Sequence, residues 1–198
     1  MARLGILLSG SGSTYANLAD RIADGTLAAE IAVVVSSRAD AGGIERAKQR
    51  GHPVVVAREA AAVTAALRAH RAEFVAMCGY MRFWDPPGEF AGKTVNVHPA
   101  LLPAFGGKGM YGHHAHAAVI AAGCKISGCT VHLVAGDYDR GPIIAQRAVA
   151  VLDTDDADAL AARVQAAERA VYPGAIAALR AGRVRGVGGR CVVDGGIG

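Results

Sequence analysis

The chain has 198 residues, of which 52% are hydrophobic, 19% charged and 5% aromatic, and this composition suits a single soluble domain. No window approaches the roughly 18 consecutive apolar residues of a membrane span, and the apolar run 4–8 ends in glycines too early for a signal peptide, so we expect a cytoplasmic protein without a membrane partner. The formal net charge of +4 is scattered along the chain, which argues against a nucleic-acid partner and suits small anionic substrates.

The first half of the chain alternates between short apolar runs and segments of helical composition. This alternation predicts an α/β fold with a Rossmann-like open sheet that is parallel in its N-terminal half. We expect strands at 3–8, 31–35, 54–56, 74–78 and 94–97, and helices at 14–23, 43–49, 60–70 and 111–122.

The second half predicts a different strand arrangement. Two candidate strands, 130–134 and 143–149, are joined by the turn-rich segment 135–141, which is too short for a helical crossover. We therefore expect these C-terminal strands to be antiparallel.

A long helix and a hairpin are expected to end the chain. The helix should bend at its proline, where a backbone donor is lost, and it should stop at a glycine. The hairpin should turn at a pair of glycines. The helix is expected at 156–181 with its bend at Tyr172 and Pro173 and its stop at Gly182, and the hairpin strands at 183–187 and 190–193 around Gly188 and Gly189.

Neither the cysteines nor the clustered histidines predict a metal site. The cysteines include no CxxC pair and no zinc-like spacing with a pair of histidines, so we expect reduced thiols. Neighbouring residues on a helix point about 100° apart, so adjacent histidines cannot easily share one ion. The residues concerned are Cys78, Cys124, Cys129 and Cys191, and His113, His114 and His116.

A glycine-rich loop separates the first expected strand from the first expected helix. It contains Gly10, Ser11, Gly12 and Ser13. Glycines permit close approach of a ligand to the backbone, and the free amide groups at a helix start favour phosphate. The loop matches neither the GxGxxG nor the Walker pattern, and a plain strand-to-helix turn is the alternative interpretation.

The aromatic segment 79–84 follows another expected strand. An apolar slot bordered by Arg82 could hold a flat ring with a carboxylated tail. The alternative is a loop that packs its aromatic side chains on the domain.

Asn96 and His98 lie two residues apart at the end of the expected strand 94–97, so the period of a strand places both side chains on one face. An amide donor beside an imidazole can polarise a carbonyl group and stabilise its oxyanion. A carboxylate from Asp137 or Asp139 could orient His98 and raise its pKa. The spacing along the chain does not show which of the two aspartates would do so. The alternative to a catalytic role is that His98 is a structural histidine.

In the long helix, Gln165, Glu168 and Tyr172 fall on one face. From the residues alone, this face is also what a solvated helix surface would show.

Taken in order, these motifs resemble the folate-dependent glycinamide ribonucleotide formyltransferases of purine synthesis. The resemblance covers nearly the whole chain, and its most specific part is the string Asn-x-His-Pro-x-Leu-Leu-Pro followed by Asp-x-Gly-Pro. The matching segments are 8–13, 79–82, 96–105, 128–142 and 163–173.

The resemblance implies formyl transfer from 10-formyltetrahydrofolate, as a co-substrate, to the primary amine of glycinamide ribonucleotide, without a metal. It implies that Asn96, His98 and Asp139 are catalytic, which selects Asp139 over Asp137 as the carboxylate. The implied phosphate and ribose contacts are Gly10, Ser11, Gly12, Ser13, Thr14, Gln165 and Glu168, and the implied folate contacts are Met81, Arg82, Phe83, Val134, Asp137 and Tyr138.

Two departures from the family pattern stand out. Thr14 occupies a position where many members have Asn, and the stretch 108–112 is longer than in the commonest form. The first concerns one phosphate or sugar contact, and the second borders the substrate side.

The resemblance also implies a domain organisation and a set of rivals. We expect one domain with a phosphate-binding half at 1–95, a catalytic and folate half at 96–182 and a hairpin at 183–198, acting on small molecules as a monomer or homodimer. The rival functions are another folate-dependent formyltransferase, a formyltetrahydrofolate hydrolase and a non-catalytic nucleotide-binding module. A formyltransferase that acts on initiator transfer RNA would carry an additional C-terminal RNA-binding barrel, and the hydrolase an additional N-terminal regulatory domain, and we expect neither in a chain of this length.

Overall fold

The structure is a computed structural model that describes residues 1–187 and 190–197. The chain forms two compact units, Met1–Asn96 and Val97–Gly198. The expected turn of the C-terminal hairpin, at Gly188 and Gly189, lies outside the described residues. That the whole chain is a single domain with halves at 1–95 and 96–182 stays a prediction.

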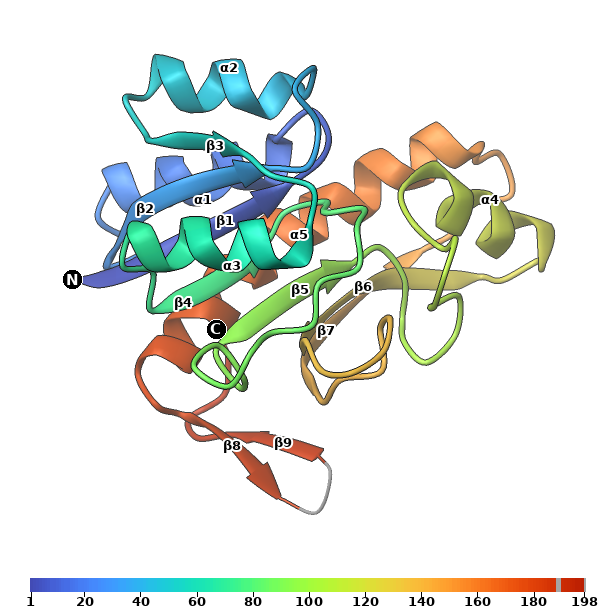
Figure 1. The fold of residues 1–198 in the computed structure, drawn as a ribbon. Helices are drawn as coiled ribbons and strands as arrows, with labels where there is room; N and C mark the ends of the chain where they lie inside the picture. The colour runs from blue at the N-terminus through green and yellow to red at the C-terminus, as the bar shows by residue number, and fades with distance from the viewer. Residues whose placement is uncertain (188–189, 198) are drawn as a thin grey trace. The chain divides into compact units, whose positions relative to one another are not determined.

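The first unit contains a parallel sheet in the order β3-β2-β1-β4-β5 (Figure 1). Apolar residues on both faces of β1 and β2 are buried, as expected for parallel strands that are covered on both sides. The sequence prediction of a parallel N-terminal half is therefore confirmed. The strands are β1 (Ala2–Leu8), β2 (Ala29–Ser36), β3 (Val54–Val56), β4 (Phe74–Met77) and β5 (Thr94–His98), whose last two residues belong to the second unit.

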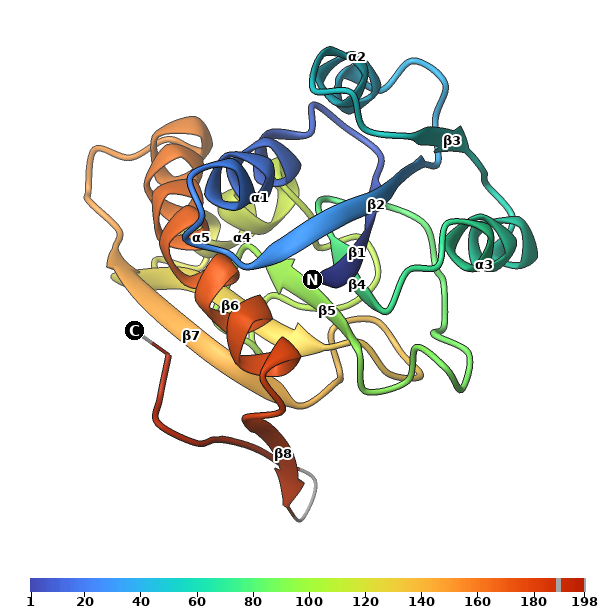
Figure 2. The ribbon, with the colours of Figure 1, turned by 90° about the vertical axis from the view of Figure 1, so that its left-hand side faces the viewer.

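Three helices cover this sheet: α1 (Ser13–Ala23), α2 (Gly42–Gln49) and α3 (Ala60–Ala69). Right-handed crossovers from β1 through β2 to β3 place α1 and α2 on one face, and the return of the chain to β4 places α3 on the other. Figure 2 shows α1 and α3 on opposite sides of the sheet. The loops that follow β1, β2 and β4 consequently meet at one edge, where the strands end.

The second unit is built on the antiparallel pair β6 (Ile126–Leu133) and β7 (Ile143–Ala150), which confirms the predicted antiparallel strands. The helix α5 (Ala157–Arg180) packs against both strands, and α4 (His113–Ala121) packs against α5. Strand β6 starts at Ile126 rather than at the expected residue 130. Its extension depends on Gly128, where a Cβ atom would lie 2.0 Å from the carbonyl oxygen of Arg147 on β7.

The ends of the second unit follow the sequence closely. The side chain of Asp156 caps α5 by accepting a hydrogen bond from the Ala159 amide at 2.8 Å, and the helix contains Pro173. The expected bend at that proline stays a prediction. Strands β8 (Val184–Val187) and β9 (Arg190–Val193) form the predicted antiparallel hairpin, which projects beyond the end of α5 (Figure 1). Within residues 1–187 and 190–197, no helix is both long and apolar enough to cross a membrane.

A buried threonine on β6 holds the segment that follows His98. The Thr130 hydroxyl donates to the carbonyl of Ala100 at 2.7 Å and accepts from the Leu102 amide at 3.0 Å. The side-chain amide of Gln146 donates to Thr130 Oγ1 at 3.0 Å and to the Leu102 carbonyl at 2.9 Å. These bonds fix the backbone after β5 against the β6–β7 pair.

We expect Thr130→Val to lower the free energy of unfolding by about 1–3 kcal/mol, because it leaves the Leu102 amide buried without an acceptor at nearly constant side-chain volume. Urea denaturation measures this loss. Ser127→Ala is the matched control, since the Ser127 hydroxyl is also buried but has no hydrogen-bond partner among the described residues. Equal losses in the two variants would contradict this account of Thr130.

Candidate active site

A buried histidine and a carboxylate meet in the second unit. His98, at the end of β5, places Nδ1 3.3 Å from Oδ2 of Asp139, and the two side chains are 3% and 12% exposed. Asp139 has a φ of 55°, in the left-handed region that residues with a side chain rarely adopt. Such backbone strain persists where the surroundings impose it, and it is enriched at functional sites. Asn96 precedes His98 by two residues in the same strand, so both side chains point to the same face of β5.

The structure separates the two candidate aspartates. Asp137 is exposed, and its Oδ1 accepts a hydrogen bond from the Tyr138 amide at 2.7 Å, so its carboxylate serves the turn. Asp139 instead faces His98. The carboxylate partner of the histidine is therefore Asp139.

Three further groups contact this pair, and the sequence reasoning missed all of them. Oδ2 of Asp139 accepts from the Gly107 amide at 3.0 Å, and Oδ1 lies 3.5 Å from Nε2 of the buried His132. Nε2 of His98 lies 2.8 Å from the carbonyl oxygen of Phe105. The only sequence signal for His132 was its position in a predicted strand. Phe105 and Gly107 gave no signal, because their contacts are made by backbone groups.

Charge and burial act in opposite directions on the two side chains. Burial favours the neutral acid of Asp139, but the hydrogen bond from His132, the His98 ring and the Gly107 amide outweigh it and hold the pKa of the carboxyl below its usual value. For His98, burial lowers the pKa, and it outweighs the raising effects of Asp139 and of the Phe105 carbonyl. The sequence-based expectation of a raised His98 pKa is thus correct for the effect of the carboxylate and wrong for the sum, because the imidazole is almost wholly buried.

Titration of His98 by NMR tests this balance. We expect a pKa below the ordinary histidine value in the wild type and a still lower one in Asp139→Asn, which removes the charge that favours the imidazolium. An unchanged His98 pKa in the variant would show that the two groups are not coupled.

The glycine-rich loop of the first unit is shaped by close backbone packing. Gly12 is the N-cap of α1 with a φ of 75°, and a Cβ atom there would lie 2.6 Å from the Gly43 Cα. The Gly43 amide donates to the Gly10 carbonyl at 3.1 Å, and Arg46 Nε donates to the Ser11 carbonyl at 2.9 Å. The N-cap residue Gly12 makes no side-chain cap hydrogen bond to α1, and the first amide groups of a helix favour an anion.

The other expected contacts of this loop are also placed. Gly10, Ser11 and Ser13 are exposed, and Thr14 is half-buried in the first turn of α1. The loop is therefore accessible to a ligand, and its shape requires a glycine at position 12.

The aromatic segment after β4 divides into a buried and an exposed part. Trp84 is buried, and its Nε1 donates to Thr64 on α3 at 3.0 Å, which fits the alternative of packing on the domain. Met81, Arg82 and Phe83 are exposed, which leaves them available to a ligand. In the second unit, Val134 and Tyr138 are half-buried.

Glu168 on α5 is a buried carboxyl group rather than part of a solvated helix face. It is 8% exposed, Tyr172 is fully buried, and only Gln165 of the three is exposed. Burial raises the pKa of Glu168 to about 7, and the charge of Arg169 opposes this only in part. The alternative of a solvated surface is therefore wrong for Glu168 and Tyr172.

The raised pKa of Glu168 predicts a dependence of stability on pH. Because the folded state holds the proton more tightly than the unfolded chain, the contribution is fully present below pH 4.5 and is lost as the pH rises through about 7. The loss amounts to roughly 3 kcal/mol. We expect Glu168→Gln to flatten the pH profile of the unfolding free energy between pH 5 and 8, measured by urea denaturation, whereas Glu45→Gln, at an exposed position, should not.

The histidines of α4 diverge as their sequence spacing predicts. His116 is buried, whereas His113 lies 3.3 Å from Asp158 and His114 packs edge-on against Tyr111. Among the side chains of residues 1–187 and 190–197, no group of three His, Cys, Asp or Glu is placed to hold a metal ion.

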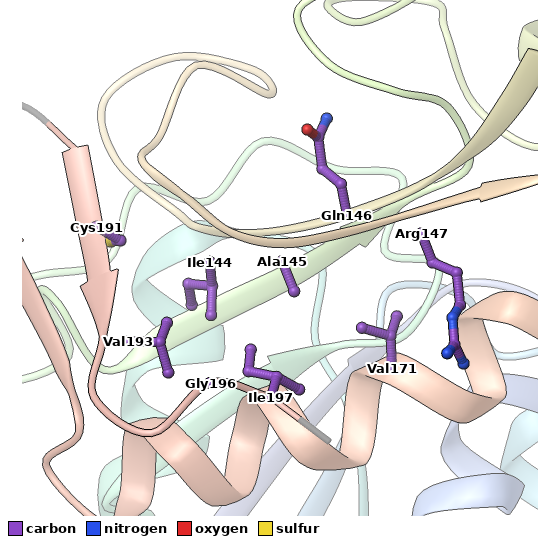
Figure 3. Close-up of a pocket in the computed structure, with 9 residues that line it drawn as sticks. All are labelled: Ile144, Ala145, Gln146, Arg147, Val171, Cys191, Val193, Gly196 and Ile197. Atoms are coloured by element: carbon purple, nitrogen blue, oxygen red, sulfur yellow. The ribbon is translucent and has the colours of Figure 1, made fainter.

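A separate pocket of about 390 Å³ lies between β7, α5 and the C-terminal residues (Figure 3). Its lining includes Arg147, Val171, Cys191, Val193 and Ile197. Figure 3 shows the Gln146 side chain pointing away from Val193 and Ile197. The pocket contains none of the predicted catalytic, phosphate or folate residues, so we do not assign it to the active site.

The comparison with known proteins defines the class. The chain matches the formyl transferase family model over residues 2–176, so it belongs to this family. It is 40% identical to a phosphoribosylglycinamide formyltransferase of Mycobacterium tuberculosis over 94% of this chain and 89% of the relative. It is also 35% identical to the chloroplastic phosphoribosylglycinamide formyltransferase of Arabidopsis thaliana, over 92% of this chain and 67% of that protein.

Solved structures agree with this assignment. The crystal structure of glycinamide ribonucleotide transformylase 1 from Symbiobacterium toebii has a TM-score of 0.90 and 37% identity, over 98% of this chain and 94% of that one. The fold is therefore the formyltransferase fold. A formyltetrahydrofolate deformylase from Pseudomonas syringae pv. tomato has a TM-score of 0.86 and 25% identity, over 97% of this chain and 65% of that one.

Proposed function

We propose that this chain transfers the formyl group of 10-formyltetrahydrofolate to the primary amine of glycinamide ribonucleotide. The observation that supports this most is the buried His98–Asp139 pair, beside Asn96 on one strand, in a chain of the formyl transferase family. The products are formylglycinamide ribonucleotide and tetrahydrofolate, in purine synthesis. The relatives that share most of its length are phosphoribosylglycinamide formyltransferases.

In the proposed reaction, the amine nitrogen attacks the formyl carbon and the formyl oxygen becomes an oxyanion. The Asn96 amide and the His98 ring donate hydrogen bonds to this oxygen. Nδ1 of His98 faces Asp139, so the donor to the oxyanion would be Nε2, which would exchange its contact with the Phe105 carbonyl for the oxyanion. The new negative charge favours the imidazolium in the transition state, which offsets the effect of burial on the pKa of His98.

Asp139 has two roles in this proposal. Its ionised carboxylate stabilises the His98 imidazolium, and its position allows it to order a water molecule that moves the proton from the attacking amine to the leaving nitrogen of the folate. The collapse of the tetrahedral intermediate then breaks the bond between the formyl carbon and that nitrogen. The reaction releases tetrahydrofolate and the formylated amide.

The proposed substrate contacts are those that the family resemblance implies, and the exposure of residues 10, 11, 13 and 81–83 supports part of them. The amide groups of residues 10–13 and Thr14 would hold the phosphate of the ribonucleotide. Gln165 and Glu168 would bind the ribose hydroxyls, because both side chains carry an oxygen that accepts a hydrogen bond from a hydroxyl group. The folate would contact Met81, Arg82 and Phe83, and the residues Val134, Asp137 and Tyr138 of the second unit. Small molecules are the only partners proposed, and a monomer or homodimer in the cytoplasm stays a prediction.

An assay of formyl transfer tests the proposal and its rivals. With 10-formyltetrahydrofolate, we expect rapid formation of tetrahydrofolate only when glycinamide ribonucleotide is present, because the bound phosphate positions the amine. The acceptor without its phosphate should react far more slowly. His98→Ala should lower the turnover by about 100- to 1000-fold, the usual cost of one oxyanion donor.

The controls separate the alternatives. His70→Ala, at a half-buried position outside the proposed site, should keep full turnover. Equal formyl loss with and without acceptor would identify a hydrolase, and binding without turnover would identify a nucleotide-binding module. Near-normal turnover in His98→Ala would contradict the role of this side chain.

A further inference from the structure

A single buried hydroxyl joins two of the loops at the end of the parallel sheet. Ser9, directly after β1, is 3% exposed, and its Oγ accepts a hydrogen bond from the Met81 amide at 2.9 Å. The Ser9 amide in turn donates to the Gly79 carbonyl at 3.1 Å. The residue that begins the glycine-rich loop therefore holds the residue that begins the exposed segment 81–83.

A second buried hydroxyl completes this arrangement. Ser9 Oγ lies 2.6 Å from Oγ of Ser37, which follows β2 and is 2% exposed. The Ser37 amide donates to the Leu8 carbonyl at 3.0 Å. Since β1 lies between β2 and β4 in the sheet, Ser9 occupies the middle of three adjacent loops.

The hydrogen-bond capacity of a serine predicts a cost for an apolar residue of similar size at position 9. A hydroxyl group can donate one hydrogen bond and accept two. The Ser9 hydroxyl accepts from the Met81 amide and shares a second hydrogen bond with the Ser37 hydroxyl. Both serines are shielded from water, so the Met81 amide would lose its acceptor without replacement. A serine needed only to start the turn would not require either contact.

We infer that Ser9 is a positioning residue that couples the phosphate loop, residues 10–13, to the segment 81–83, so that an anion bound at the loop stabilises the Met81 turn. This inference rests on the proposed function for the identity of the two ligands. Coupling of this kind is reciprocal, so folate bound at residues 81–83 would equally favour binding of the phosphate. The acceptor would thereby prepare the folate contacts before the two substrates react.

Hydrogen exchange of the Met81 amide, followed by NMR with inorganic phosphate as the probe, tests the coupling without any need for turnover. In the wild type we expect phosphate to shift the Gly12 amide signal and to slow Met81 exchange by about fivefold, the equivalent of one modest hydrogen bond. The Val75 amide, bonded to the Lys93 carbonyl within the sheet, is the reference and should not respond.

Two serine variants form a matched pair. Both Ser9→Ala and Ser37→Ala remove the contact between the hydroxyls, but only Ser9→Ala removes the acceptor of the Met81 amide. We expect the phosphate effect on Met81 to persist in Ser37→Ala and to vanish in Ser9→Ala. In turnover assays, Ser9→Ala should raise KM for 10-formyltetrahydrofolate severalfold with a much smaller change in kcat.

The outcomes are distinct. If phosphate shifts Gly12 in the wild type but leaves Met81 exchange unchanged, or if neither amide responds, the coupling does not exist; an equal phosphate effect in Ser9→Ala overturns the role of its hydroxyl. The wild-type measurement decides the matter even if Ser9→Ala does not fold. Phosphate protection of Met81 in a chain that transfers no formyl group would refute the proposed function and leave this inference standing.

Discussion

The carboxylate of Asp139 imposes the main constraint on the candidate catalytic region of the second unit. It lies between the His98 and His132 rings and accepts the Gly107 amide, and its backbone adopts a left-handed conformation to reach them. A buried carboxylate is costly unless donors surround it, and these donors keep it ionised. The segment after β5, held by Thr130, brings the Phe105 carbonyl and the Gly107 amide to the same place. The negative charge of Asp139 thereby sets the positions of the His98 ring, of the turn that carries Asp139 and of the loop at Gly107.

The loops of the first unit are held in a different way, through close backbone packing and buried hydroxyl groups. Close packing of Gly12 against Gly43 shapes the loop at the start of α1, and the buried serines at positions 9 and 37 connect the adjacent loops. Free amide groups at a helix start favour an anion without a buried cation.

Much of the candidate site could be predicted because its signals are local. The period of β5 places Asn96 and His98 on one face, and the glycines of residues 10–13 indicate a tight turn before a helix. The direction of the His98 pKa could not be predicted, because burial depends on which distant segments cover the ring, and here burial outweighs Asp139. For the same reason the helical spacing of Gln165, Glu168 and Tyr172 in α5 did not show that Glu168 is buried.

The sequence by itself determined the order and type of the elements, the parallel and antiparallel parts of the sheet, and the family resemblance, because these depend on residue periodicity, turn length and motifs read along the chain. Only the tertiary structure decided which aspartate faces His98, that His132 shares its carboxylate, and that the Ser9 hydroxyl holds Met81. These contacts join residues far apart in sequence, and several involve backbone groups that every residue possesses. Their hydrogen bonds and their shielding from water arise only when the chain has folded, so no local pattern records them.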